Sequence, residues 1–209
     1  QREHDAEPTY ASELKAPVMP RLVLLHGWGA NADDLRPVGE ALQHRHPDPL
    51  DVVALDAPEP HPQPPGRQWY GLFPAQWQDV PSAVESLRAR LTQLDGGEEA
   101  LPSTVLFGFS QGGAMALEVG CSLNLAGVIS CSGYPHPGWT PPATHPPVLL
   151  LHGDQDAIVP AMAMDAIWQR LDPSRREKHQ FQDGHTIPEN AMPSLSQALI
   201  QMLNPSSSN

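Results

Sequence analysis

The sequence predicts one α/β domain with a mostly parallel central sheet and helices on both faces. Short aliphatic runs recur along the chain and are continuous rather than alternating, as in strands that are buried on both sides. Between them lie segments with apolar residues at three- and four-residue steps, which indicate amphipathic helices. Right-handed crossovers then bring the loops after the strands to one edge of the sheet, where sites form in such folds.

The strand-like runs are expected, in chain order, at Leu22–Leu25, Val52–Leu55, Thr104–Phe107, Gly127–Ser130 and Val148–Leu151, with the more polar Lys178–Gln182 as a later edge strand. The helical pattern predicts helices over Asp33–Gln43, Pro81–Leu94, Gln111–Cys121, Ala161–Leu171 and Glu189–Leu203. Pro81 suits the first turn of a helix, and Gly96 and Gly97 suit the end of one.

A chain of 209 residues suits one domain. We expect an N-terminal extension over residues 1–19, a domain over 20–204 without a large lid, and a flexible tail over 205–209. Proline fixes φ and lacks an N–H group, so the segments Pro58–Pro65 and Pro135–Pro147 are predicted to be stiff surface loops rather than linkers.

The charge balance narrows the classes of partner. Twelve Lys and Arg residues stand against 24 Asp and Glu, a net charge of −12, which argues against nucleic-acid binding and electrostatic membrane docking. No apolar run reaches the roughly 18 residues of a membrane span, so no integral membrane association is expected. Cys121 and Cys131 suggest small buried side chains and a reducing, cytoplasmic location. The chain begins at Gln1, which leaves open whether a leader was removed.

The strongest motif follows the run Thr104–Phe107. Gly108-Phe109-Ser110-Gln111-Gly112 fits the G-x-S-x-G nucleophile elbow of the α/β-hydrolase fold, in its strand–turn–helix context. The serine lies at the apex of a sharp turn, and the flanking glycines avoid collisions with the adjoining strand and helix. Ser110 is therefore the predicted nucleophile.

A serine hydroxyl needs a base, and His185 is the candidate among ten histidines. It follows the expected edge strand and precedes the last helix. His26 and His152, which end strands beside glycines, are interpreted as structural hydrogen-bonding residues. Six others lie in polar or proline-rich segments that we expect at the surface: His4, His44, His46, His61, His136 and His145. His179 lies within the expected edge strand.

An orienting carboxylate should lie between serine and histidine in the chain. Asp154 and Asp156 both follow the run Val148–Leu151, and the residues alone favour the two almost equally as the orienting acid. The oxyanion hole needs two backbone N–H groups. Gln111, after the nucleophile, and Trp28, in the glycine-rich loop after the first strand, are the candidates. No spacing indicates a metal or nucleotide cofactor, so none is expected.

Taken together, Leu25-His26-Gly27-Trp28-Gly29, Gly108–Gly113, His152–Asp156 with Val159-Pro160, and Gly184-His185 resemble the phospholipase/carboxylesterase family, which includes acyl-protein thioesterases and small bacterial carboxylesterases. The resemblance spans residue 20 to the C-terminus. It implies a Ser–Asp–His hydrolase without a cofactor and assigns the acid to Asp156. It also implies that Arg67, Trp69 and Tyr70 form a substrate-side loop. Trp69 and Tyr70 then either line an acyl pocket or pack the proline-rich loop.

The predicted function is a serine carboxylesterase acting on small to medium carboxylic esters. One alternative is an acyl-protein thioesterase or lysophospholipase for long acyl chains, since the same triad serves both. Another is a non-catalytic ligand-binding or interaction module on the same scaffold. A small-molecule ester is the expected partner, and a homodimer is compatible with the sequence, although no residue indicates one.

Overall fold

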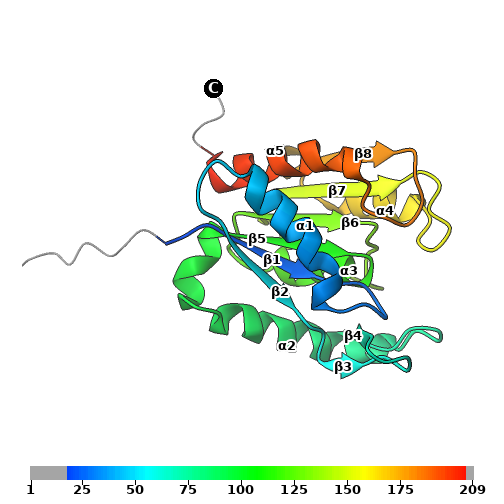
Figure 1. Cartoon of the computed structure of the whole chain (residues 1–209). Helices are drawn as coiled ribbons and strands as arrows, with labels where there is room; N and C mark the ends of the chain where they lie inside the picture. Colours follow the sequence, from blue (N-terminus) through cyan, green and yellow to red (C-terminus); the bar gives the residue numbers. More distant parts are fainter. Residues whose placement is uncertain (1–17, 206–209) are drawn as a thin grey trace, which may run out of the picture.

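The computed structural model describes residues 18–205, so the predicted extension over 1–19 lies almost wholly outside that range. Six parallel strands form the central sheet in the order β2-β1-β5-β6-β7-β8 (Figure 1). Their bounds are β1 Arg21–Leu25, β2 Asp51–Leu55, β5 Thr104–Phe109, β6 Gly127–Cys131, β7 Val148–Gly153 and β8 Arg176–Phe181. The predicted α/β architecture with a parallel sheet is confirmed, and β8 is the expected edge strand.

The part of the chain described forms five α-helices that cover the sheet: α1 Ala32–Arg45, α2 Val80–Gln93, α3 Gln111–Gly120, α4 Met162–Arg170 and α5 Met192–Leu203. Alternate side chains of the strands pack into two hydrophobic clusters, one on each face. One cluster joins the sheet to α2, α3 and α4 through residues such as Leu87, Met115 and Ile167. The other joins it to α1 and α5 through Leu35 and Leu199. Helices on both faces are thus confirmed.

Local sequence explains where the first helix begins. The side chain of Asn31 accepts a hydrogen bond from the Asp34 N–H, and the Asp34 carboxylate accepts one from the Asn31 N–H at 3.0 Å. This capping box satisfies two donors at the start of α1. Pro81 lies in the first turn of α2, as the sequence predicts, because an N–H group is not needed there.

The structure adds elements that the sequence pattern did not indicate. A two-stranded antiparallel ribbon pairs β3 Glu59–Pro60 with β4 Arg67–Gln68 inside the proline-rich region. Short 3-10 helices occur at η1 Trp77–Asp79, η2 Gly97–Ser103, η3 Pro173–Arg175 and η4 Glu189–Ala191. The last of these forms the first turn of the helix expected over Glu189–Leu203. Within residues 18–205, no helix combines the length and hydropathy needed to cross a bilayer.

Candidate active site

Ser110 lies between the end of β5 and the start of α3. Its φ of 58° and ψ of −116° are unusual for a residue with a side chain and mark local strain. The strained peptide is held from both sides, because the Ser110 N–H donates to the Cys131 carbonyl at 2.9 Å and the Ser110 carbonyl accepts from the Ala114 N–H at 3.0 Å. The turn therefore holds the serine at the carboxyl edge of the sheet, as in a nucleophile elbow.

The glycines of the motif are required by close backbone approaches. A Cβ atom on Gly108 would overlap the carbonyl of Gly112, and one on Gly112 would overlap the carbonyl of Leu25. Gly27 is also close, since a Cβ there would lie 3.3 Å from the Cβ of Ser110. These contacts bring the loop after β1 directly beside the serine.

His185 and Asp156 form a hydrogen-bonded pair at the same edge. The His185 Nδ1–H donates to Asp156 Oδ2 at 2.7 Å. The other carboxylate oxygen, Oδ1, accepts from the N–H groups of Ile158 at 2.9 Å and Val159 at 2.8 Å. The Asp156 side chain is wholly buried, whereas that of His185 keeps 19% of its surface exposed. This is the geometry of a base and its orienting acid.

The Asp156 carboxylate is ionised by its partners. Burial alone would raise its pKa, but the hydrogen bonds from His185, Val159 and Ile158 outweigh burial and lower the pKa below its ordinary value. Asp154, by contrast, is exposed. Of the two candidate acids, the structure brings Asp156 to His185.

The histidine ring lies next to the nucleophile segment. Phe109, which precedes Ser110, has its ring centroid 4.9 Å from that of His185. The three candidate catalytic residues follow β5, β7 and β8, whose carboxyl ends share one edge. His152 is buried, as expected, and its Nε2–H donates to the Val159 carbonyl at 2.8 Å. Its role is to support the loop that carries Asp156.

The two candidate oxyanion donors flank Ser110. Gln111 is the first residue of α3, so its N–H is one of the helix donors without an intrahelical acceptor. Trp28 belongs to the loop that touches Ser110 through Gly27. Within residues 18–205, no carbonyl accepts a hydrogen bond from the main-chain N–H of either residue. Both N–H groups are therefore available to a developing oxyanion.

His26 has the structural role that the sequence predicts. It is fully buried, its Nε2 accepts from the Ala57 N–H at 2.9 Å, and its Nδ1–H donates to the Gly27 carbonyl at 2.7 Å. Desolvation, the largest effect, lowers its pKa, so the ring is neutral. It orders the loop that carries Trp28 and is not a second base.

The three residues of the predicted substrate-side loop are used for internal bonding. The Arg67 guanidinium donates to the carbonyls of Ala57 and Pro58 at 2.5 and 2.8 Å. Trp69 is 2% exposed, and its indole N–H donates to the His26 carbonyl at 2.9 Å. Tyr70 is fully buried. Of the two interpretations left open by the sequence, these contacts favour packing and support of the loop over lining of an acyl pocket.

A buried polar network was missed at the sequence level. His46, His136 and His145 were expected at the surface, but all three are buried, and His136 and His145 each have a tertiary hydrogen-bond partner at Nε2. The Tyr70 hydroxyl lies 2.6 Å from the Tyr134 hydroxyl and 2.7 Å from His136 Nε2. The Asp172 N–H donates to His145 Nε2 at 3.0 Å. An apolar pattern carries no signal for such contacts.

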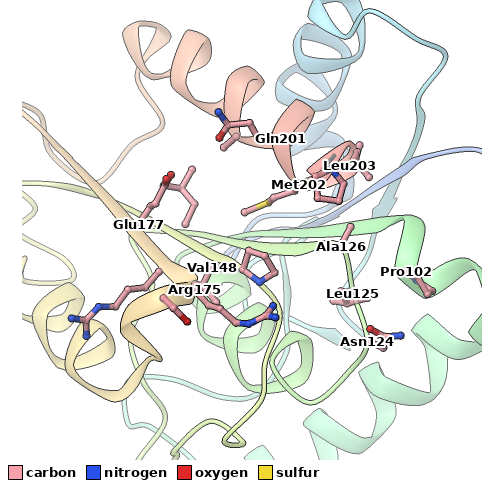
Figure 2. A pocket seen from close by; sticks show the side chains of 16 residues that line it. Pro102, Asn124, Leu125, Ala126, Val148, Arg175, Glu177, Gln201, Met202 and Leu203 are labelled. Atoms are coloured by element: carbon pink, nitrogen blue, oxygen red, sulfur yellow. The ribbon is translucent and has the colours of Figure 1, made fainter. Parts of the chain in front are cut away.

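Figure 2 shows a cavity of about 520 Å³, and none of the candidate residues lines it. It is lined by Val148 at the start of β7, Glu177 near the start of β8, and Met202 near the end of α5. It therefore occupies the amino edge of the sheet, opposite Ser110. Among the described residues, no group of three or more His, Cys, Asp or Glu side chains is arranged to hold a metal ion.

The chain is similar to known proteins in both sequence and fold. A family model described as Phospholipase/Carboxylesterase matches residues 11–203. The chain is 32% identical over 157 residues to "Esterase YpfH" of Escherichia coli (strain K12). The match covers 68% of this chain and 64% of that protein, so it spans slightly less than two thirds of that protein's length. Esterase PE8 is 29% identical, with a TM-score of 0.76 over 89% of this chain and 94% of its own. Acyl-protein thioesterase 2 of Zea mays shares the fold, with a TM-score of 0.66 at 19% identity over 90% and 96% of the two chains.

Proposed function

Because the chain belongs to the phospholipase/carboxylesterase family, a family of ester hydrolases with the predicted α/β-hydrolase fold, we propose that it is a serine carboxylesterase for small to medium carboxylic esters. The observation that carries the proposal is the meeting of three features at one sheet edge. These are the strained turn at Ser110, the paired His185 and Asp156, and the N–H groups of Trp28 and Gln111, for which the described residues provide no main-chain acceptor.

In the proposed first step, His185 Nε2 takes the proton from Ser110 Oγ as Oγ attacks the ester carbonyl carbon. The carbonyl oxygen becomes an oxyanion that the N–H groups of Trp28 and Gln111 stabilise, each contributing roughly 3 kcal/mol. The tetrahedral intermediate then collapses, and His185 gives its proton to the departing alcohol. An acyl ester on Ser110 remains.

In the second step, His185 removes a proton from water as the water oxygen attacks the acyl carbonyl. Collapse of the second intermediate releases the carboxylic acid and returns the proton to Ser110 Oγ. Asp156 stays ionised throughout, in keeping with its lowered pKa, and holds the imidazole with Nδ1–H towards itself. No step requires a cofactor.

A second candidate is hydrolysis of long-chain acyl thioesters or lysophospholipids. Large apolar side chains are exposed on loops near the site: Phe73 is 76% exposed beside Trp28, with their ring centroids 5.3 Å apart, and Ile158, two residues after Asp156, is 63% exposed. Exposed apolar side chains on both loops suit contact with a long hydrocarbon chain. The hydrogen-bonded pair of His185 and Asp156 and the strained turn at Ser110 argue against a non-catalytic module. The cytoplasmic location and the homodimer stay untested predictions.

The test is hydrolysis of p-nitrophenyl esters from acetate to palmitate beside a palmitoyl thioester, with wild type and Ser110→Ala. We expect kcat/KM to fall beyond about six carbons and Ser110→Ala to be folded and inactive. A rise of kcat/KM towards palmitate, with turnover of the thioester, would replace the first candidate by the second. Near-wild-type activity of Ser110→Ala would refute the mechanism.

A further inference from the structure

The segment from Gly66 to Tyr70 touches both halves of the candidate oxyanion hole. The main chain of Arg67 pairs with the loop after β1: its carbonyl accepts from the Gly29 N–H at 2.9 Å, and its N–H donates to the Ala30 carbonyl at 2.7 Å. The same segment continues into Trp69 and Tyr70, which reach α3. A single stretch of chain thus spans the distance between the two N–H donors.

On the α3 side, the contact is made by the side chain of Gln111. Its Oε1 accepts from the Trp69 N–H at 3.0 Å, and its Nε2 donates to the Tyr70 carbonyl at 2.8 Å. The residue is fully buried, so both bonds are shielded from water. Two hydrogen bonds at opposite ends of one amide fix the side chain, and with it the peptide N–H at the start of α3.

On the β1 side, the contact is made by the indole of Trp69. Its Nε1–H donates to the His26 carbonyl at 2.9 Å, and the ring centroids of Trp69 and His26 lie 5.6 Å apart. That carbonyl belongs to the peptide directly before Gly27, the residue that touches Ser110 and precedes Trp28. Through this bond, Trp69 fixes the direction in which the loop enters the oxyanion hole.

We infer that Trp69 is a positioning residue for ester hydrolysis, which joins the two oxyanion donors through its indole N–H and its main-chain N–H. This inference rests on the proposed function. It gives Trp69 a role that does not involve contact with the acyl chain. Two donors stabilise an oxyanion only when both are aimed at the same point, and small displacements of such groups are costly to the rate.

If Trp69 had a purely structural role, its replacement would have a different effect. Trp69 also belongs to the hydrophobic cluster on the α2 face, so its replacement could lower stability without affecting chemistry. Loss of packing would lower the melting temperature and leave the transition state of the folded enzyme unchanged. Loss of positioning would lower kcat and weaken binding of an oxyanion mimic, with little change in KM.

The experiment compares Trp69→Phe with Trp139→Phe. Trp139 is likewise buried in that cluster, at 7% exposure, and the described residues offer its indole no hydrogen bond. For each variant we would measure kcat and KM with p-nitrophenyl butyrate, the inhibition constant of a trifluoromethyl ketone, and the melting temperature. The ketone adds Ser110 to form a tetrahedral oxyanion, so its affinity reports on both N–H donors.

We expect Trp69→Phe to lower kcat about 10- to 100-fold, with KM within about twofold, and to raise the inhibition constant by a similar factor. Trp139→Phe should show a similar loss of melting temperature with kcat unchanged. If Trp69→Phe does not fold, Gln111→Met provides the same readouts, because it removes the clamp and keeps the backbone N–H.

Values of kcat and the inhibition constant for Trp69→Phe within twofold of those for Trp139→Phe would overturn the inference and leave the proposed function intact. For Gln111→Met, both values within twofold of wild type would do the same. An inactive wild type would instead refute the proposed function, and this inference with it.

Discussion

Replacing Asp156 by Asn tests how the hydrogen bonds of one carboxylate control the protonation of His185. Oδ1 of Asp156 accepts two backbone bonds, from Ile158 and Val159, and Oδ2 accepts the Nδ1–H of His185. An amide has one acceptor oxygen. Because two backbone N–H groups, one of them buried, need an acceptor, the oxygen of Asn will face Ile158 and Val159, and its NH₂ group will face His185.

The consequence is a change of tautomer. An NH₂ group donates, so Nδ1 of His185 must become the acceptor, and the ring proton moves to Nε2. A protonated Nε2 cannot take the proton of Ser110, and the imidazolium loses its counter-ion. We therefore expect kcat to fall about ten-thousandfold, or about 5 kcal/mol in the activation barrier. The fold should persist, because the bonds to Ile158 and Val159 survive.

The assay is kcat for p-nitrophenyl acetate at pH 7.5 with Asp156→Asn and, as the matched control, Asp154→Asn. The exposed Asp154 is two residues away in the same loop, so its variant should stay within about twofold of wild type. A kcat for Asp156→Asn within tenfold of wild type would refute the tautomer argument. A larger loss in Asp154→Asn would assign the acid to the other carboxylate.

Further predictions concern pH, backbone sterics and thiol reactivity. The pKa of Asp156 is lowered in the folded state, so its carboxylate stabilises the fold above about pH 4, and this stabilisation is lost as the pH falls below that. The difference in melting temperature between wild type and Asp156→Asn should therefore become smaller from pH 7 to pH 3. Gly108→Ala should lower the free energy of unfolding, measured by urea titration, by about 3 kcal/mol or more, because the new Cβ would overlap the backbone of Gly112. Gly184→Ala should lower it by less than about 1 kcal/mol, because the atom nearest to its Cβ would be 3.8 Å away. Burial raises the pKa of Cys121 and Cys131 to about 12 each, so neither thiol should react with Ellman's reagent at pH 8 until the protein is unfolded in guanidinium chloride, when both should.

Much of the sheet could be predicted because its central strands are buried on both faces. Such strands leave continuous aliphatic runs, and the chemical residues follow them directly, as Ser110 follows β5. The edge strand β8 begins at Arg176, two residues earlier than expected, because its largely exposed side chains carry no apolar pattern. The ribbon of β3 and β4 was not predicted, since two-residue strands arise from pairing across the loop.

Only part of the candidate site could be predicted from the sequence, for a similar reason. Glycine spacing identified the elbow, but Asp154 and Asp156 could not be separated from the residues alone, because the distinction lies in which side chain meets His185 in space. The role of Trp69 and the burial of His136 depend on partners 43 and 66 positions away in the chain. Contacts of this range leave no local pattern.

The most direct test of the central claim, that Ser110 is an activated nucleophile, is labelling with a fluorophosphonate followed by intact-mass and peptide mass spectrometry. We predict one adduct per chain, located on Ser110, with much slower labelling of Asp156→Asn. Absence of an adduct in the folded protein, or an adduct on another serine, would contradict the account.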